Sequence, residues 1–358
     1  MGISMKATVV IPTHNRSAHL VALLRCLSNQ VGNYISQVII CDDGSSDDTE
    51  EAAREFYDRL PLVYCRQEDR GFRAGQARNM GIVRAIGDIL VFVDDDVLIA
   101  DDFISEHIQA HSRSKDPLIV IGYRYRTCID QFRQPTIEEI LMGEPDDRLS
   151  KLRKSGVNVN EHKTPWAFVY SCNFSVIRGS TELMFDENFV GWGMEDVELG
   201  YRLMEDGFSI VVAPKAIVLH IEAQKPLDPF RCEINNLQPN YSSYIRNTVY
   251  LLCKHAHDPV LQEFCRNELR WFVRDKELGC WMKNIHANDP DLVIEYCLSE
   301  FAARKIDSAA TNDIIQAPTL QKVAQEERPS AVEYHFGEPI APNDKTDSLP
   351  RTKNADPH

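Results

Sequence analysis

The first hundred residues alternate between short apolar runs and longer segments with apolar residues at helical spacing. The apolar runs cover residues 8–11, 38–41, 62–64 and 89–93. Helical spacing follows Ser17, resumes after Asp47 or Asp48, and then covers residues 74–86. Strands that are apolar throughout and alternate with helices form parallel sheets covered on both faces. The sequence therefore predicts an α/β fold, with a Rossmann-like, mostly parallel sheet between two layers of helices.

The pattern weakens and then returns in the second hundred residues. Residues 123–161 carry many charges and little periodicity, which predicts an irregular connection. Beyond it, strand-like sequence alternates with one helical segment that ends at Gly207, a typical C-terminal glycine. The predicted strands cover residues 168–177, 209–213 and 216–219, and the predicted helix covers residues 197–204.

The C-terminal third differs in character from the rest. Asp258-Pro259 and Asp289-Pro290 each place a capping residue before a proline at a first helical position. Both pairs precede apolar residues at helical spacing, so we expect a small helical subdomain. Beyond residue 316, prolines are scattered among polar residues without periodicity, which is typical of disorder. The predicted division is 1–225 for the α/β domain, 226–315 for the helices and 316–358 for the tail.

Composition and charge exclude several classes of function. A net charge of −15 argues against nucleic-acid binding, although Arg66, Arg70, Arg73 and Arg78 could hold a small anion. No apolar run approaches the about 20 residues that span a bilayer, and no signal pattern precedes the first strand. We therefore expect a cytoplasmic protein without a transmembrane segment. The ten cysteines are scattered without a Cys-x-x-Cys pair, which favours reduced core thiols.

Polar residues follow three of the predicted strands directly. Thr13 and Asn15 follow the first strand, Asp43 the second, and the triplet 94–96 (Asp-Asp-Asp) the fourth. Because ligands of parallel sheets bind outside the carboxyl ends of the strands, these side chains should meet at one edge. Three adjacent carboxylates require positive charge nearby, and a divalent cation is the simplest candidate. The alternative is an acidic turn that caps the next helix.

Five segments carry recognisable motifs along the chain. They are Val-Ile-Pro-Thr-His-Asn-Arg at 10–16, Cys-Asp-Asp-Gly-Ser-Ser-Asp at 41–47, Ala-Arg-Asn-Met-Gly at 77–81, the Asp triplet at 94–96 and Trp-Gly-Met-Glu-Asp at 192–196. In this order the five segments resemble family 2 glycosyltransferases of the GT-A fold, and the resemblance covers about residues 6–225. The segment at 192–196 also resembles the acceptor-side motif of galactosyl- and N-acetylgalactosaminyltransferases, with Met194 in place of the usual glycine.

The resemblance implies a donor site for a nucleotide sugar. Asp43 would accept a hydrogen bond from the uracil ring, and Asp94 would bind the ribose. Asp96 and His220 would hold Mn²⁺ or Mg²⁺, because oxygen-rich sites suit these ions. A simple helix cap at Asp43, a surface ion pair at Arg78 and a structural histidine at position 220 are the alternatives. The implied donor-binding residues are Pro12, Thr13, Asn15, Arg16, Asp43, Arg78, Asp94, Asp95 and Asn173.

The resemblance also implies the acceptor side of the reaction. Inversion at the anomeric carbon requires a base that takes the proton of the attacking hydroxyl group. Asp196 would be this base, while Glu195 would bind sugar hydroxyl groups. Trp192 offers a flat face to a sugar ring, and Gly193 allows the loop to pack closely. The alternatives are a core tryptophan and two carboxylates that merely cap the helix.

The expected function is therefore transfer of a hexose or N-acetylhexosamine from a UDP-sugar to a hydroxyl acceptor, most simply a glycan. A nucleotidyltransferase would need a glycine-rich basic loop after the first strand, where this chain has Pro12-Thr13-His14-Asn15. A non-catalytic sugar-nucleotide sensor or scaffold would tolerate a damaged base or metal motif, and both motifs are intact. His107 and His111 have helical spacing but lack the acidic partner of a metalloprotease motif.

Overall fold

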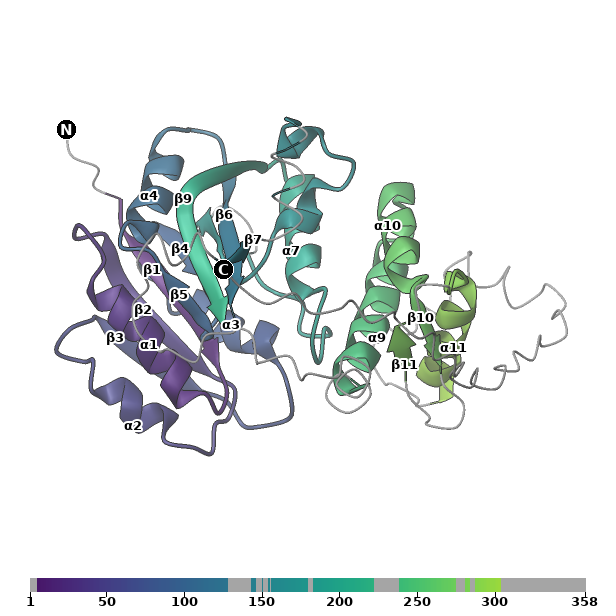
Figure 1. The fold of residues 1–358 in the computed structure, drawn as a ribbon, viewed down its shortest axis with the longest axis horizontal. Coiled ribbons are helices and arrows are strands. Elements are labelled where there is room, and N and C mark those ends of the chain that lie inside the picture. Colours follow the sequence, from purple (N-terminus) through teal and green to yellow (C-terminus); the bar gives the residue numbers. More distant parts are fainter. Residues whose placement is uncertain are drawn as a thin grey trace, which may run out of the picture. The chain divides into compact units, whose positions relative to one another are not determined.

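The computed structural model describes residues 5–127, 143–145, 150, 154, 156–179, 183–221, 238–274, 281–283 and 287–303. In this part of the chain one large mixed sheet has the strand order β3-β2-β1-β4-β8-β6-β9-β5, and β7 (Glu144–Pro145) pairs with β6. Helices cover both faces of the sheet (Figure 1). The predicted α/β architecture is confirmed.

The N-terminal half of the sheet is parallel, as the sequence predicts. β1 (Ala7–Thr13) pairs in parallel with both β2 (Ile35–Asp42) and β4 (Ile89–Phe92), and β2 pairs in parallel with β3 (Leu62–Arg66). The carboxyl ends of β1, β2 and β4 therefore lie side by side. This register brings Thr13, Asp43 and the Asp triplet to the same edge.

The second half of the sheet differs from the prediction. β8 (Phe174–Ile177) is shorter than expected, because Pro165–Phe168 form a 3₁₀ turn and the chain turns again before β8, where the N–H of Asn173 donates to the carbonyl oxygen of Tyr170 at 3.0 Å. β8 runs antiparallel to both β4 and β6 (Leu118–Thr127). The two strands expected at 209–213 and 216–219 form one long strand, β9 (Ser209–Ile221). β9 runs parallel to β6 with a register shift after Gly122 and antiparallel to β5 (Val97–Ile99).

Two hydrophobic cores separate the sheet from its helices. One core lies under α1 (Ser17–Ser28), α2 (Thr49–Arg54) and α4 (Phe103–Ser112). The other lies under α3 (Ala74–Ile82) and α7 (Glu195–Glu205), where Phe92 stacks on Phe174 with ring centroids 4.6 Å apart. The cysteines at 26, 41, 65, 172 and 253 are buried and unpaired, as the sequence predicts.

The C-terminal elements are α9 (Gln238–Lys254), α10 (Pro259–Leu269) and α11 (Pro290–Ala303), with a hairpin of β10 (Phe272–Arg274) and β11 (Trp281–Lys283) that the sequence did not predict. Both predicted caps form: Asp258 accepts from the backbone of Val260 and Leu261, and Asp289 from Leu292. The predicted tail at 316–358 lies outside the described residues. The 225/226 boundary stays a prediction. Among the described helices none is long and apolar enough to cross a membrane.

Candidate active site

Asn15 joins the carboxyl end of β1 to the loop after β2. Its backbone N–H donates to the hydroxyl oxygen of Ser45 at 2.9 Å, and its side-chain oxygen accepts from the backbone of Ser46 at 2.7 Å. The backbone of Asn15 is left-handed, with φ of 53°, a conformation that asparagine tolerates better than most residues. This side chain therefore shapes the loop that carries Asp43.

Asp43 lies in this loop and is 5% exposed. Its backbone N–H donates to the carbonyl oxygen of Thr13 at 2.9 Å, one residue after the buried Pro12. Its carboxylate accepts from the side chain of Gln67 and from the backbone of Arg73, both at 2.6 Å. Burial raises the pKa of Asp43, and these hydrogen bonds oppose the rise. The carboxylate is thus held in a fixed orientation beside the end of β1.

Arg16 neutralises part of the Asp triplet. Its Nη1 lies 3.3 Å from Oδ1 of Asp95 and also contacts Asp96, while the hydroxyl group of Thr13 donates to Oδ2 of Asp95 at 2.8 Å. Burial and the charge of Asp96 raise the pKa of Asp95 to about 7. The positive charge that the triplet requires is therefore supplied in part by the protein. The Arg16 side chain is 47% exposed, so it can also move away.

Asp96 and His220 face each other across β5 and β9. Oδ1 of Asp96 is buried, accepts no hydrogen bond and lies 3.4 Å from Nε2 of His220. The pairing of Val97 with His220 fixes this approach. A carboxylate oxygen and an imidazole nitrogen at this separation can bind one cation together. The described residues hold no cluster of three or more such ligands, and Mg²⁺ and its analogues often use one or two protein ligands plus substrate phosphates. The donor set therefore fits the expected ion.

Arg78 of α3 connects the Asp triplet to α7. Its Nη2 lies 2.8 Å from Oδ1 of Asp94, and its Nη1 lies 3.2 Å from Oε1 of Glu195. The side chain is almost fully buried. Burial would lower the pKa of Arg78, but Asp94 and Glu195 raise it, so the guanidinium stays charged. This contact rules out a surface ion pair at Arg78, which was the alternative from sequence.

Glu195 and Asp196 begin α7 and differ in environment. Burial and the charge of Asp196 raise the pKa of Glu195 to about 7, although Arg78 opposes the rise. The carboxylate of Asp196 accepts from its own helix at Val197 at 2.8 Å and from the backbone of Ser171 at 3.2 Å. Both oxygens of the Asp196 carboxylate thus have backbone N–H donors. The two adjacent carboxylates can therefore serve different purposes.

The loop before α7 has an unusual backbone. Gly191, Gly193 and Met194 all adopt positive φ, at 78°, 103° and 73°. The Met194 conformation is uncommon for a residue with a side chain, at a position where glycine is usual in the motif that this segment resembles. Trp192 is 49% exposed and stacks on Tyr244 with ring centroids 5.2 Å apart. Trp192 is therefore a surface residue rather than a core tryptophan.

Asn173 lies in a buried polar cluster with His107. Its Nδ2 donates to the carbonyl oxygens of Tyr123 and Ala216, at 3.1 and 3.0 Å, and its Oδ1 lies 3.2 Å from Nε2 of His107. Both ends of the amide thus have protein partners, and the donor-sugar contact of Asn173 stays a prediction. His107 and His111 both contact the hydroxyl group of Ser175, at 2.8 and 2.9 Å, which accounts for them structurally.

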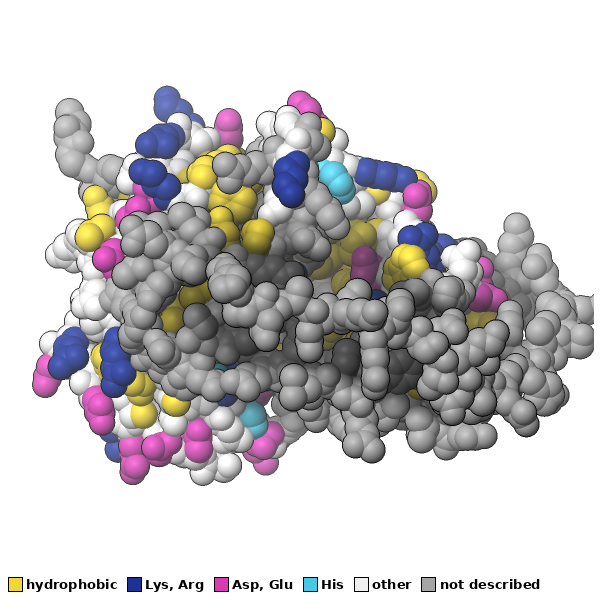
Figure 2. Space-filling view, in the orientation of Figure 1, with side chains coloured by type: hydrophobic (Ala, Val, Ile, Leu, Met, Phe, Trp, Pro, Cys, Tyr) yellow, Lys and Arg dark blue, Asp and Glu magenta, His cyan; other side chains and the backbone are white. Residues whose placement is uncertain are grey.

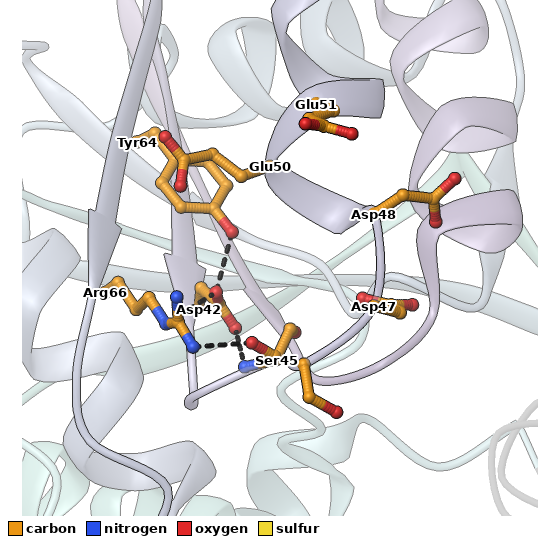
Figure 3. A pocket seen from close by; sticks show the side chains of 9 residues that line it. Asp42, Ser45, Asp47, Asp48, Glu50, Glu51, Tyr64 and Arg66 are labelled. Carbon is orange, nitrogen blue, oxygen red and sulfur yellow. Dashed lines mark hydrogen bonds and ion pairs between the residues drawn. The ribbon is translucent and has the colours of Figure 1, made fainter.

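A separate depression of about 420 Å³ lies on the other side of the loop after β2. Figure 3 shows the Tyr64 hydroxyl group pointing to Asp42, to which it donates at 2.6 Å, with Arg66 beside it. Figure 2 shows acidic side chains along the edge that carries α2. None of the predicted donor-binding residues lines this depression. Its lining is Asp42, Ser45, Ser46, Asp47, Asp48, Glu50, Glu51, Tyr64 and Arg66.

The structure thus brings most of the predicted residues into one connected group. Arg78 links the residues at the sheet edge to those at the start of α7. The sequence could not reveal that Arg16 binds the Asp triplet in this structure. Gln67 carried no recognisable signal in the sequence, and Arg73, noted there only as part of a basic cluster, holds Asp43 through its backbone N–H. The connected predicted residues are Thr13, Arg16, Asp43, Arg78, Asp94, Asp95, Asp96, Glu195, Asp196 and His220.

The sequence of residues 8–179 matches the model of the family described as glycosyl transferase family 2. The validoxylamine A glucosyltransferase of Streptomyces hygroscopicus subsp. jinggangensis is 29% identical over 262 residues, which cover 68% of this chain and 61% of the relative. The hyaluronan synthase of Pasteurella multocida is 31% identical over 223 residues, which cover 56% of this chain and 23% of the relative. The chain thus spans about three fifths of the first relative and a smaller share of the second.

Solved structures show the same fold at low sequence identity. S. aureus TarS 1-349 in complex with UDP-GlcNAc has a TM-score of 0.50 and 18% identity, over 74% of this chain and 73% of that one. The mannosyltransferase PcManGT from Pyrobaculum calidifontis, in complex with GDP-Man and Mn²⁺, has a TM-score of 0.50 and 15% identity, over 89% and 83%. The fold is GT-A, and residues 8–179 match the model of glycosyl transferase family 2. The chain therefore carries a glycosyltransferase domain.

Proposed function

We propose that this protein is a metal-dependent, inverting glycosyltransferase that moves a hexose or N-acetylhexosamine from a UDP-sugar to a hydroxyl group of a carbohydrate. The observation that carries the proposal is the contact of Arg78 with both Asp94 and Glu195. This one buried side chain joins the edge of the sheet, where a nucleotide would bind, to the helix that begins with the candidate base. The family domain and the named transferases among the relatives support the class of reaction.

The donor would bind along the carboxyl ends of β1, β2 and β4. Asp43 has a fixed carboxylate for the N–H group of a uracil ring, and Pro12, Thr13 and Asn15 would line the pocket. Asp94 and Asp95 would contact the ribose, and Asp96 and His220 would hold Mn²⁺ or Mg²⁺. When bound, the ion neutralises the charge that develops on the departing diphosphate. Arg16 would leave the carboxylates and turn toward the phosphates, since its side chain is half exposed.

The acceptor would bind at the start of α7. Asp196 would take the proton of the attacking hydroxyl group, and the two backbone N–H groups that donate to its carboxylate would hold it in place. Glu195 would bind a sugar hydroxyl group beside it. The exposed ring of Trp192 would pack on the apolar face of the acceptor sugar, and Gly193 would keep the loop close.

Calorimetric titration with UDP, GDP and dTDP, each with Mn²⁺ and with EDTA, tests the donor proposal. We expect UDP to bind with Mn²⁺ and to bind much more weakly with EDTA, because Asp96 and His220 would act through the ion. Tighter binding of GDP or dTDP would replace UDP in the proposal. If no nucleotide binds under either condition, the proposal is wrong and the domain serves another purpose.

A further inference from the structure

Helix α9 and the loop before the candidate base both lie beyond the segment that matches the family, and the two contact each other. The backbone N–H of Trp192 donates to Oγ of Ser243 at 3.1 Å. Nδ2 of Asn247 donates to the carbonyl oxygen of Gly193 at 2.8 Å. Two consecutive residues of the loop therefore have their backbone polar groups satisfied by side chains of one helix.

A third side chain of α9 extends this contact. The guanidinium of Arg246 donates to the carbonyl oxygen of Val190 and to the side-chain oxygen of Asn247, the latter at 2.6 Å. Residues 243, 246 and 247 lie on one face of a helix, since positions three and four apart are neighbours. Asn247 is fully buried, so its amide needs these partners. We define Ser243, Arg246 and Asn247 as the α9 clamp.

The loop lies against α9 too closely for ordinary side chains. A Cβ atom at Gly191 would lie 2.4 Å from Cβ of Ser243, and one at Gly193 would lie 2.7 Å from Cδ2 of Tyr244. The Trp192 ring stacks on that same Tyr244. Hydrogen bonds, close backbone approach and ring stacking thus hold this loop in one place.

The loop leads directly into α7. Only Met194 separates Gly193 from Glu195, and its positive φ sets the direction in which the helix starts. A shift of the loop would therefore move Glu195 and Asp196 together. Catalytic geometry is sensitive to such shifts, since a displacement of about 1 Å can cost about a hundredfold in rate.

We propose that α9 is part of the active site, with Ser243 and Asn247 as positioning residues for Glu195 and Asp196. The inference rests on the proposed function for its catalytic part, because only a transferase needs the base in place. The acceptor side of the site is then built from two regions of the chain, the segment of residues 190–196 and helix α9.

Three variants of the full chain test this proposal. Ser243→Ala removes the acceptor of the Trp192 bond, and Asn247→Leu removes the donor to Gly193 at similar volume. Ser242→Ala, the same change at an exposed neighbour on α9, is the matched control. Hydrogen exchange of a peptide covering residues 188–196 should be faster in Ser243→Ala and Asn247→Leu and unchanged in Ser242→Ala. Unchanged exchange in both clamp variants would overturn the proposal.

Measurement of turnover distinguishes a role of α9 in positioning Glu195 and Asp196 from a role in fold stability alone. With UDP-sugar and Mn²⁺, release of UDP per folded molecule should fall about tenfold to a hundredfold in the clamp variants, while UDP affinity stays that of the wild type. Faster exchange with wild-type turnover would refute the catalytic part. Failure of the wild type to bind UDP would contradict the proposed function, and the exchange result would still decide whether α9 holds the loop.

Discussion

At the scale of single residues, two arginines determine the electrostatics of this site. Arg16 is half exposed and contacts Asp95 and Asp96, whereas Arg78 is buried and contacts Asp94 and Glu195. A half-exposed arginine can leave its carboxylate partners and bind a ligand with little loss of free energy. A buried one cannot, because its departure leaves charges without compensation. Arg16 is therefore suited to contact a substrate, and Arg78 to hold the site together.

Replacement of Arg78 by Met should destabilise the fold strongly. The change leaves the buried Glu195 and the partly buried Asp94 without their cation, and loss of one partner of a buried ion pair costs about 3–5 kcal/mol. Chemical unfolding of both proteins measures this difference. Arg84→Met, on the same segment but at an exposed position, is the matched control and should leave stability nearly unchanged. Equal stabilities of wild type and Arg78→Met would show that the two carboxylates are protonated or hydrated instead.

Asp196→Asn and Asp96→Ala should separate catalysis from donor binding. Asp196→Asn keeps the shape of the side chain but removes the proposed base, so transfer should stop while UDP affinity stays nearly unchanged. Asp96→Ala removes a proposed metal ligand, so UDP affinity should fall in Mn²⁺ and change little in EDTA. Calorimetry measures the affinities, and UDP release measures turnover. Full turnover of Asp196→Asn would exclude it as the base.

At the scale of elements, Glu198 ties α7 to α9. Its carboxylate is fully buried and accepts hydrogen bonds from Nε of Arg202 at 2.8 Å and from Nζ of Lys254 at 2.7 Å. Nε2 of His255 lies 3.4 Å from the same oxygen. Burial alone would raise the pKa of Glu198, but hydrogen bonds from His255 and Arg202 and the nearby positive charges lower it to about 2. α9 thus holds α7 in two places, at the loop that precedes α7 and at Glu198 within the helix.

This network predicts a pH dependence of stability. The folded-state pKa of Glu198 lies below its unfolded value of about 4.5, so its contribution is complete above pH 4.5 and is lost as pH falls toward 2. The contribution is about 3 kcal/mol. The difference in unfolding free energy between wild type and Glu198→Gln should therefore shrink from pH 5 to pH 2. A difference that stays constant over this range would contradict the lowered pKa.

Apart from the short β5 (Val97–Ile99), the strands and helices of the first hundred residues could be predicted, because each apolar run is short and bounded by turn residues. β8 and β9 could not be placed, because antiparallel pairing and a register shift after Gly122 depend on long-range contacts. Asn173 depends on long-range contacts in the same way, because the partners of its side-chain amide come from α4, β6 and β9.

At the scale of the whole molecule, the net charge of −15 opposes the approach of an anionic nucleotide. The basic cluster noted in the sequence offers limited compensation, because Arg66 lies 3.5 Å from Asp42, Arg70 pairs with Glu68 at 2.7 Å and Arg78 is buried between carboxylates. Neutralisation of a diphosphate would therefore depend on local charges at the end of β4. A metal ion at Asp96 is therefore a better source of positive charge for the diphosphate than the protein surface.

The shared position of Arg78 has a thermodynamic consequence. A donor that forms a hydrogen bond with Asp94 would weaken the ion pair of Asp94 with Arg78. The guanidinium would then interact more strongly with Glu195. Glu195 would then release its proton more readily, and by reciprocity a charged Glu195 would strengthen donor binding. Occupancy of the nucleotide site and the protonation of the acceptor site would become linked equilibria. Through a single buried side chain, the charged form of Glu195 would be more populated when the donor is bound.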